Sequence, residues 1–114
     1  MSSSRRSTKR TVLQRQLRQL SRRMIFGTLS ETFRTCGQPT CRCHHGGPKH
    51  GPHLQISYRG AGGKTTGAHV PAAIGERVRD GVAAWQRFQV VARELADLHR
   101  ESAWAVHRKA ADRR

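Results

Sequence analysis

Residues 36–53 read Cys36-Gly-Gln-Pro-Thr-Cys41-Arg-Cys43-His44-His45-Gly-Gly-Pro-Lys-His50-Gly-Pro-His53. This segment holds all three cysteines of the chain and four of its seven histidines. Thiolate and imidazole are the ligands that zinc prefers, and a structural zinc site takes four of them in a tetrahedron. The segment therefore predicts a knuckle of the chain folded around zinc as its cofactor.

Three of the four expected ligands are Cys36, Cys41 and Cys43. The fourth is expected to be His50, because the Gly-Gly-Pro sequence at 46–48 lets the chain turn back before this residue.

Other assignments remain open for these side chains. His53 is the second choice for the fourth ligand, whereas His44 and His45 follow Cys43 so closely that the chain has little room to fold back. Disulfides fit poorly, because the cysteine count is odd and Cys41 and Cys43 are too close in sequence to pair comfortably. The alternative to zinc is a set of three reduced, buried cysteines beside a solvated turn.

The length and composition fit one small domain with a thin core. The chain has 114 residues, of which 35% are hydrophobic and 5% aromatic. A core of this size usually needs an additional constraint, and a structural metal is one. We predict a single domain over residues 8–110, between a disordered basic tail at 1–7 and a short tail at 111–114.

The charge is strongly and unevenly basic. Lysine and arginine number 22 against 7 acidic residues, a net charge of +15. Residues 1–30 carry eight basic residues and no acidic one. Such a surplus indicates a polyanionic partner, most often nucleic acid.

The sequence has no apolar run long enough for a membrane span and no apolar segment of a secretory signal near Met1. We therefore expect a cytoplasmic protein with no membrane partner. The Ser/Arg-rich N-terminus is also typical of an organelle transit peptide, but the basic segment continues directly into the cysteines.

Two long helices are expected. The first spans residues 8–26, capped by Ser7 or Thr8, and its apolar positions lie on one face: Leu13, Leu17, Leu20 and Met24. The second spans residues 72–110. Its apolar residues from Ile74 to Leu98 recur at an average step of 24/7, close to 3.5, which favours a helix paired lengthwise with another.

A β-hairpin is predicted over residues 53–71. Residues 53–59 alternate, with Leu54, Ile56 and Tyr58 on one face, and a glycine-rich turn leads to a second strand ending at Pro71. Residues 28–35 suggest a further strand or a helical turn. The fold class is therefore α+β: a basic N-terminal helix, a zinc-knuckle-like turn, a hairpin that a third antiparallel strand can extend, and a long C-terminal helix.

The expected metal site is structural, and we expect no enzyme activity. Three thiolates and one imidazole complete a tetrahedral shell, whereas a catalytic zinc keeps an open position and usually has a carboxylate nearby. The sequence has no acidic residue between Glu31 and Glu76.

The expected partner is nucleic acid, with DNA favoured over RNA because the chain has few aromatic residues for stacking on unpaired bases. Gln55, Ser57 and Arg59, opposite the apolar face of the hairpin, are candidates for reading bases. The candidate phosphate contacts are Arg10, Arg15, Arg18, Arg22, Arg23, Arg34, Arg42, Lys49, Arg59 and Lys64.

The segment from Gly27 to Pro71 resembles an uncharacterised family of small bacterial proteins that are often encoded beside transposases on mobile elements. The shared pattern consists of Gly27, Leu29, Phe33-Arg34, the Cys-Gly-x-Pro-x-Cys-Arg-Cys motif at 36–43, His50-Gly51-Pro52, the strand 54–58, Gly63-Lys64-Thr65 and Val70-Pro71. The family usually has aromatic residues after His-Gly-Pro, where this chain has His53-Leu54. The resemblance implies His50 as the fourth ligand and a bacterial mobile-DNA context, but no activity.

These features together predict a zinc-stabilised DNA-binding accessory or regulatory protein linked to a mobile element. One alternative is an RNA- or ribosome-associated zinc protein. Another is a protein-interaction module in which the long, coiled-coil-like C-terminal helix mediates self-association, as in a homodimer, or binds an acidic partner.

Overall fold

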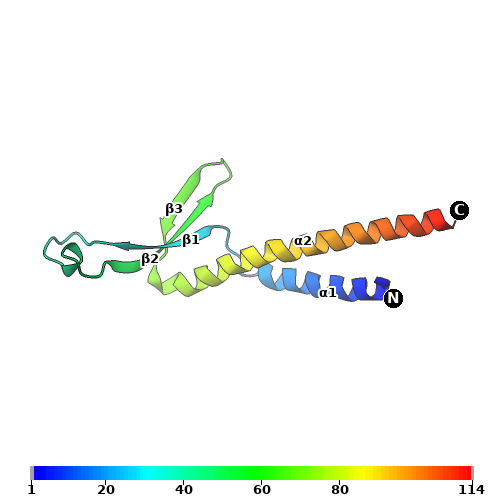
Figure 1. The fold of residues 1–114 in the computed structure, drawn as a ribbon, viewed down its shortest axis with the longest axis horizontal. Helices are drawn as coiled ribbons and strands as arrows, with labels where there is room; N and C mark the ends of the chain where they lie inside the picture. Colours follow the sequence, from blue (N-terminus) through cyan, green and yellow to red (C-terminus); the bar gives the residue numbers. More distant parts are fainter. Residues whose placement is uncertain (1, 114) are drawn as a thin grey trace. The chain divides into compact units, whose positions relative to one another are not determined.

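The computed structural model describes residues 2–113 and has the predicted α+β fold (Figure 1). A long N-terminal helix precedes a three-stranded antiparallel sheet, and a second long helix ends the chain. The elements are α1 (Ser2–Ser21), β1 (Thr28–Arg34), the 3₁₀ helix η1 (Arg42–His44), β2 (His50–Arg59), β3 (Thr65–His69), the 3₁₀ helix η2 (Ala72–Ile74) and α2 (Gly75–Asp112).

The chain forms two compact units. One unit comprises Met1–Met24 and Ala83–Arg114, and the other comprises Ile25–Val82. The first is a pair of helices, and the second holds the sheet, the cysteines and the first turns of α2.

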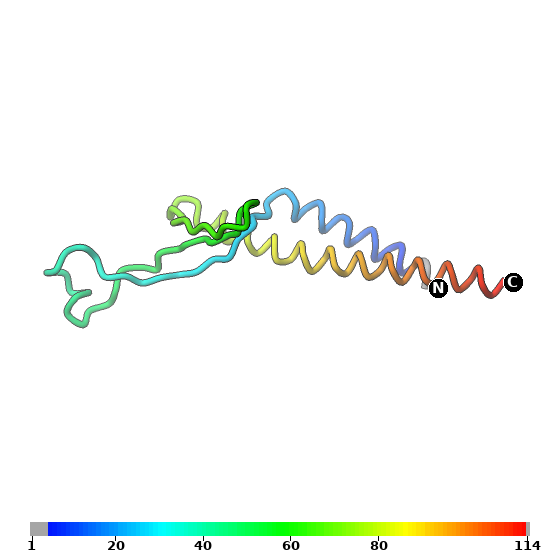
Figure 2. Tube along the Cα trace, turned by 90° about the horizontal axis from the view of Figure 1, so that it is seen from above, coloured from blue at the N-terminus to red at the C-terminus, as the bar shows by residue number. Residues whose placement is uncertain are grey.

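In the helical unit, α1 and α2 run antiparallel and side by side, as Figures 1 and 2 both show. The buried residues of α1, Leu13 and Leu20, are seven positions apart, and so are those of α2, Ala84, Val91 and Leu98. The residues packed against them fall between, at alternating steps of three and four: Leu17, Met24, Phe88 and Leu95. This is the a/d pattern of a coiled coil, and it confirms the lengthwise pairing predicted from the sequence.

The bounds of α1 differ from the prediction of residues 8–26. The helix already includes residues 2–7, which were predicted to be a disordered tail, while Met1 lies outside the described residues. It ends at Ser21, because the chain turns there and the Ile25 amide donates a hydrogen bond of 2.8 Å to the Gly81 carbonyl. Ile25 then packs against the core of the second unit.

The apolar residues from Ile74 to Leu98, which the sequence places along one seam of the second helix, are divided between the two units. Val78 and Val82 belong to the core of the sheet unit, and the later positions belong to the helical unit. Trp85 and Phe88 stack with ring centroids 6.0 Å apart, and both are half-buried. Phe88 packs against the core of the helical unit. Ile74, expected in the seam, is 43% exposed because the chain there is still the 3₁₀ helix that precedes α2.

The sheet has the order β1-β2-β3, so the hairpin is confirmed and residues 28–34 are its third strand. Leu29 pairs with Ile56 and Ile56 with Ala68, and directly paired residues point to the same face. This face holds Leu54, which is buried with Val70 from the chain after β3 and with Val78 and Val82 of α2. The opposite face of the sheet is polar.

None of the described helices is both long enough and apolar enough to cross a membrane.

Candidate metal centre

Strands β1 and β2 bring the two ends of the cysteine segment together. They pair antiparallel (Figure 1). The last pair of the register joins Arg34 to His50. Residues 36–50 therefore form a closed loop at the end of a two-stranded ribbon. The loop begins two residues after β1 with Cys36 and ends on the first residue of β2, His50.

The structure brings the four sequence-predicted ligand residues into one cluster. The Sγ atoms of Cys36, Cys41 and Cys43 and a ring nitrogen of His50 all lie within 4.8 Å of one another. The Sγ atoms of Cys36 and Cys43 are 3.7 Å apart, and Cys41 Sγ lies 3.3 Å from His50 Nε2. These four residues could hold a metal ion.

Two of the distances between donor atoms fit the edges of a tetrahedral metal site. A Zn–S bond of about 2.3 Å places two sulfurs of a regular tetrahedron about 3.8 Å apart, and a sulfur and an imidazole nitrogen slightly closer. The observed 3.7 Å and 3.3 Å match these edges. A set of three soft thiolates and one imidazole is also the donor chemistry of structural zinc sites.

Tight turns place the cysteines. The Cys41 amide donates to the Gln38 carbonyl at 3.0 Å, which closes a turn with Pro39 at its second position, where proline is favoured. A second turn follows η1 and is closed by a hydrogen bond of 2.8 Å from the Gly47 amide to the Arg42 carbonyl. A Cβ on Gly47 would lie 2.6 Å from the same carbonyl oxygen, so only glycine fits this return of the chain.

The two histidines that follow Cys43 have another role. His44 Nε2 lies 2.6 Å from the Cys36 carbonyl oxygen, and His45 Nε2 lies 3.0 Å from that of Pro39. Because a carbonyl oxygen only accepts, each Nε2 carries the proton and donates it. These rings hold the knuckle backbone from outside the cluster, a role that the sequence pattern did not indicate.

The surroundings favour a thiolate at Cys41. The backbone of Cys43, and then the imidazole of His50, lower the pKa of the Cys41 thiol to about 6. For Cys43, the backbone of Cys36 lowers the pKa, but burial and the sulfurs of Cys41 and Cys36 outweigh that effect and the pKa is raised. Several sulfurs crowded together resist further ionisation unless a cation joins them, and a bound metal would supply that positive charge.

His50 depends on the glycine that follows it. Between the pairs Thr32–His53 and Arg34–His50, β2 has one residue more than β1, which is a β-bulge. Gly51 lies in this bulge with a φ of +144°, and a Cβ there would lie 2.8 Å from the Thr32 carbonyl oxygen. A side chain at this position would therefore push the two strands apart beside the ligand.

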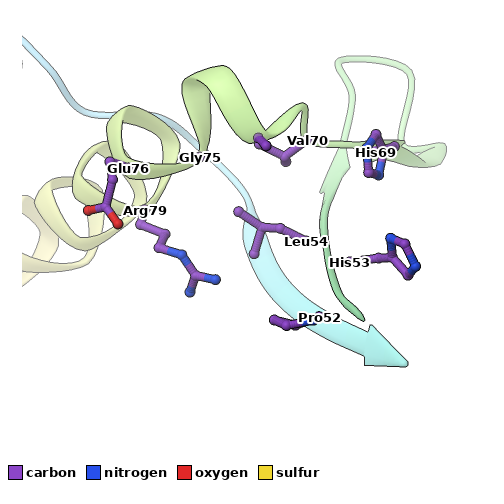
Figure 3. A pocket seen from close by; sticks show the side chains of 9 residues that line it. Pro52, His53, Leu54, His69, Val70, Gly75, Glu76 and Arg79 are labelled. Atoms are coloured by element: carbon purple, nitrogen blue, oxygen red, sulfur yellow. The ribbon is translucent and has the colours of Figure 1, made fainter. Parts of the chain in front are cut away.

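His53, the second choice for the fourth ligand, lies outside the cluster. It pairs with Thr32 in the sheet, and its ring centroid is 6.3 Å from that of His69. Both residues line a cavity of about 380 Å³ whose other side is formed by the start of α2 (Figure 3). Arg79, in the same cavity wall, forms an ion pair with Glu31.

All ten basic residues that the sequence nominated for phosphate contacts are exposed. Five belong to the helical unit and five to the sheet unit. Arg22 and Arg23, predicted to lie in the first helix, follow its end at Ser21. In α1, Arg15 and Arg18 lie on the side of the helix away from its buried leucines, as a rotation of about 100° per residue requires.

Comparison with known proteins gives one family. No curated protein and no solved structure matches the chain significantly. Residues 6–80, which include the whole sheet and the cysteine cluster, match the family described as a domain of unknown function (DUF6788), and the chain belongs to this family.

Proposed function

We propose that this protein is a small nucleic-acid-binding protein whose knuckle is stabilised by one zinc ion. The single observation that carries the proposal is the cluster of Cys36, Cys41, Cys43 and His50, whose donor atoms lie within 4.8 Å of one another, with two pairs at tetrahedral spacing. Zinc bound there would fix the loop that joins β1 to β2. The complete four-ligand shell supports a structural role for the ion instead of a catalytic one.

The packing of the knuckle supports a need for the metal. Among residues 36–50, Cys43 alone is buried, at 7% exposure. Fifteen residues cannot be held in one conformation by the burial of one small side chain, because each ordered residue costs about 1–2 kcal/mol of backbone entropy. A structural metal supplies the missing stabilisation.

The charge of the chain supports nucleic acid as the partner. Its net charge is +15, and the ten nominated basic residues are exposed. Duplex DNA is a dense line of phosphates, and binding to it grows with the number of phosphates that lysine and arginine neutralise. We favour DNA over RNA because only 5% of the residues are aromatic, which leaves few side chains to stack on unpaired bases. The resemblance described for residues 27–71 supports a role as an accessory or regulator in a mobile-element context.

The test is a titration of zinc-loaded protein against labelled duplex DNA, single-stranded DNA and RNA, repeated from low to physiological salt. Duplex binding that persists at physiological salt against both competitors would support the proposal. Equal affinity for all three would contradict the preference for DNA. No binding at low salt would contradict the nucleic-acid function altogether.

A second candidate function is protein interaction through α2. Val90, Trp104 and Val106 of this helix are 48%, 59% and 68% exposed, and contact with another apolar surface would remove their side chains from water. A homodimer formed this way would survive high salt, because burial of apolar groups is not screened. Sedimentation equilibrium at high salt distinguishes it from association that depends on charge.

A further inference from the structure

We propose that the polar face of the three-stranded sheet is the surface that enters the major groove of duplex DNA. This inference rests on the proposed nucleic-acid function and identifies the part of the protein that carries it. The two faces of the sheet differ in chemistry. One packs its apolar residues against α2, and the other is built of hydroxyl, amide, imidazole and guanidinium groups.

Strand β2 forms the middle of the polar face. Its residues at alternate positions are His53, Gln55, Ser57 and Arg59, and all four are half-buried or exposed. Figure 3 shows the division directly: the side chain of Leu54 points toward α2, and that of His53 lies on the other side of the strand.

The neighbouring strands extend the face on both sides. In β1, Thr28 pairs with Ser57, Ser30 with Gln55 and Thr32 with His53, so their hydroxyl groups share this face.

In β3, Thr65 pairs with Arg59 and His69 with Gln55, and Gly67 lies between them. The 6.3 Å separation of the His53 and His69 rings agrees with diagonal neighbours on one face.

The charge of this face complements DNA. Within the described sheet, no acidic residue lies on the polar face. The acidic residue of the strands, Glu31, pairs with Leu54 on the opposite face and forms an ion pair with Arg79. Exposed Arg34, Arg42 and Lys49, at the end of the β1–β2 ribbon and in the knuckle, would contact phosphates beside the groove.

The dimensions and side chains fit the major groove. Three strands about 4.8 Å apart span about 10 Å, and the groove is about 12 Å wide. Gln55 has the amide that bonds adenine at two positions, and Arg59 has the guanidinium that does so for guanine. Ser57 between them can bond either kind of base. Side chains of strand β2 would therefore recognise bases, and the phosphate contacts of Arg34, Arg42 and Lys49 would position the strand.

Adjacent threonines of β3 provide a matched test. Thr65 and Thr66 are both exposed, but Thr65 lies on the polar face opposite Arg59, whereas Thr66 pairs with Tyr58 on the other face. Thr65→Glu and Thr66→Glu make the same change of charge on the same strand. At physiological salt the Debye length is about 8 Å. A new charge on the face that contacts DNA would therefore repel the phosphates more strongly than one on the opposite face.

Both variants would be zinc-loaded, checked by circular dichroism, and titrated with duplex DNA. We expect Thr65→Glu to weaken duplex binding about tenfold and Thr66→Glu less than about threefold. Protection of guanine N7, which lies in the major groove, from dimethyl sulfate should appear with the parent protein and weaken with Thr65→Glu.

The outcomes separate this inference from the proposed function. Duplex binding by the parent, with equal loss in both variants or with no protection of guanine N7, would overturn the sheet face as the contact and leave nucleic-acid binding intact. If either variant fails to fold, Ser57→Ala and Gln55→Ala replace the pair, and unchanged affinity and N7 protection in both would overturn the inference. Absence of binding by the parent at low salt would overturn both.

Discussion

His50 reaches the cysteines because the strand that carries it has an extra residue. The bulge at Gly51 separates the pairing of His50 with Arg34 from the regular pairing of His53 with Thr32. One histidine is thereby placed in the cluster, and the other, three residues later, is placed in the sheet. Backbone geometry thus decides which histidine joins the cysteine cluster.

Replacement of each histidine tests this choice. His50→Ala should lose tight zinc binding, because three ligands leave the tetrahedral shell open. His53→Ala should keep one zinc ion per chain with unchanged affinity, because His53 lies outside the cluster. Competition with a chromogenic chelator measures both affinities. Loss of zinc from His53→Ala with retention in His50→Ala would contradict the assignment.

Gly51→Ala should weaken zinc binding without removing a ligand. The added Cβ would clash with the Thr32 carbonyl in a backbone conformation that favours glycine. We expect the free energy of unfolding to fall by about 1–3 kcal/mol, measured by urea denaturation of the zinc-loaded protein.

The matched control is Gly37→Ala, in the same knuckle. A Cβ at Gly37 would have no heavy atom within 4 Å, and its φ is not in the region that favours glycine. It should leave zinc affinity and stability close to those of the parent. Equal effects from the two variants would contradict the role assigned to Gly51.

At the residue scale, the sequence predicts the members of the cysteine–histidine cluster better than it predicts their surroundings. Sulfur and imidazole chemistry identified Cys36, Cys41, Cys43 and His50, which the structure brings together. The need for glycine at position 51 depends on the Thr32 carbonyl across the sheet, a contact between residues distant in sequence. No local pattern contains that information.

At the scale of elements, the pairing of α1 with α2 depends on one narrow seam. Leu98→Ala should destabilise the helical unit by about 2–5 kcal/mol, because the lost side chain leaves a cavity in a small core. Val106 on the same helix is 68% exposed. Val106→Ala should therefore change stability by less than about 0.5 kcal/mol. Thermal unfolding followed by circular dichroism compares the two variants. Equal melting temperatures would contradict the dependence of the helix pairing on its buried apolar residues.

The same helix pair offers a test of phosphate binding. Arg15→Gln with Arg18→Gln removes two exposed charges from α1, and the slope of log K against log salt for duplex DNA should fall by about 1.8. Arg93→Gln with Arg100→Gln removes two charges that pair with Asp97 on α2 and should leave the slope unchanged. Equal slopes for the two double variants would exclude α1 as a phosphate contact.

The helices also show how much of the fold the spacing of apolar residues is sufficient to predict. Heptad spacing predicts both helices and their seam, since burial on one face repeats locally along the chain. It does not predict that α1 ends at Ser21, because the chain leaves the helix through a hydrogen bond from Ile25 to Gly81. It also misses the division of the α2 seam, in which Val82 and Ala84 join different cores.

At the scale of the whole molecule, burial is distributed unevenly. The helical unit and the sheet each have a core of buried aliphatic residues, whereas the knuckle has only Cys43. A length of 114 residues with 35% hydrophobic content indicated a thin core, but composition could not locate where it is thinnest. Because the helical unit has its own core, loss of metal should unfold the knuckle and leave much of the helical signal in place.

The amount of zinc bound per chain is the most direct test of the metal centre. The protein, purified without added metal, would be analysed by native mass spectrometry and elemental analysis beside Cys41→Ser. We predict one zinc ion per chain in the parent and less than a stoichiometric amount in Cys41→Ser, with the thiols of the parent reacting only after chelation. A parent that contains no zinc, takes up none on addition, and melts at the same temperature as Cys41→Ser would contradict a zinc-stabilised knuckle.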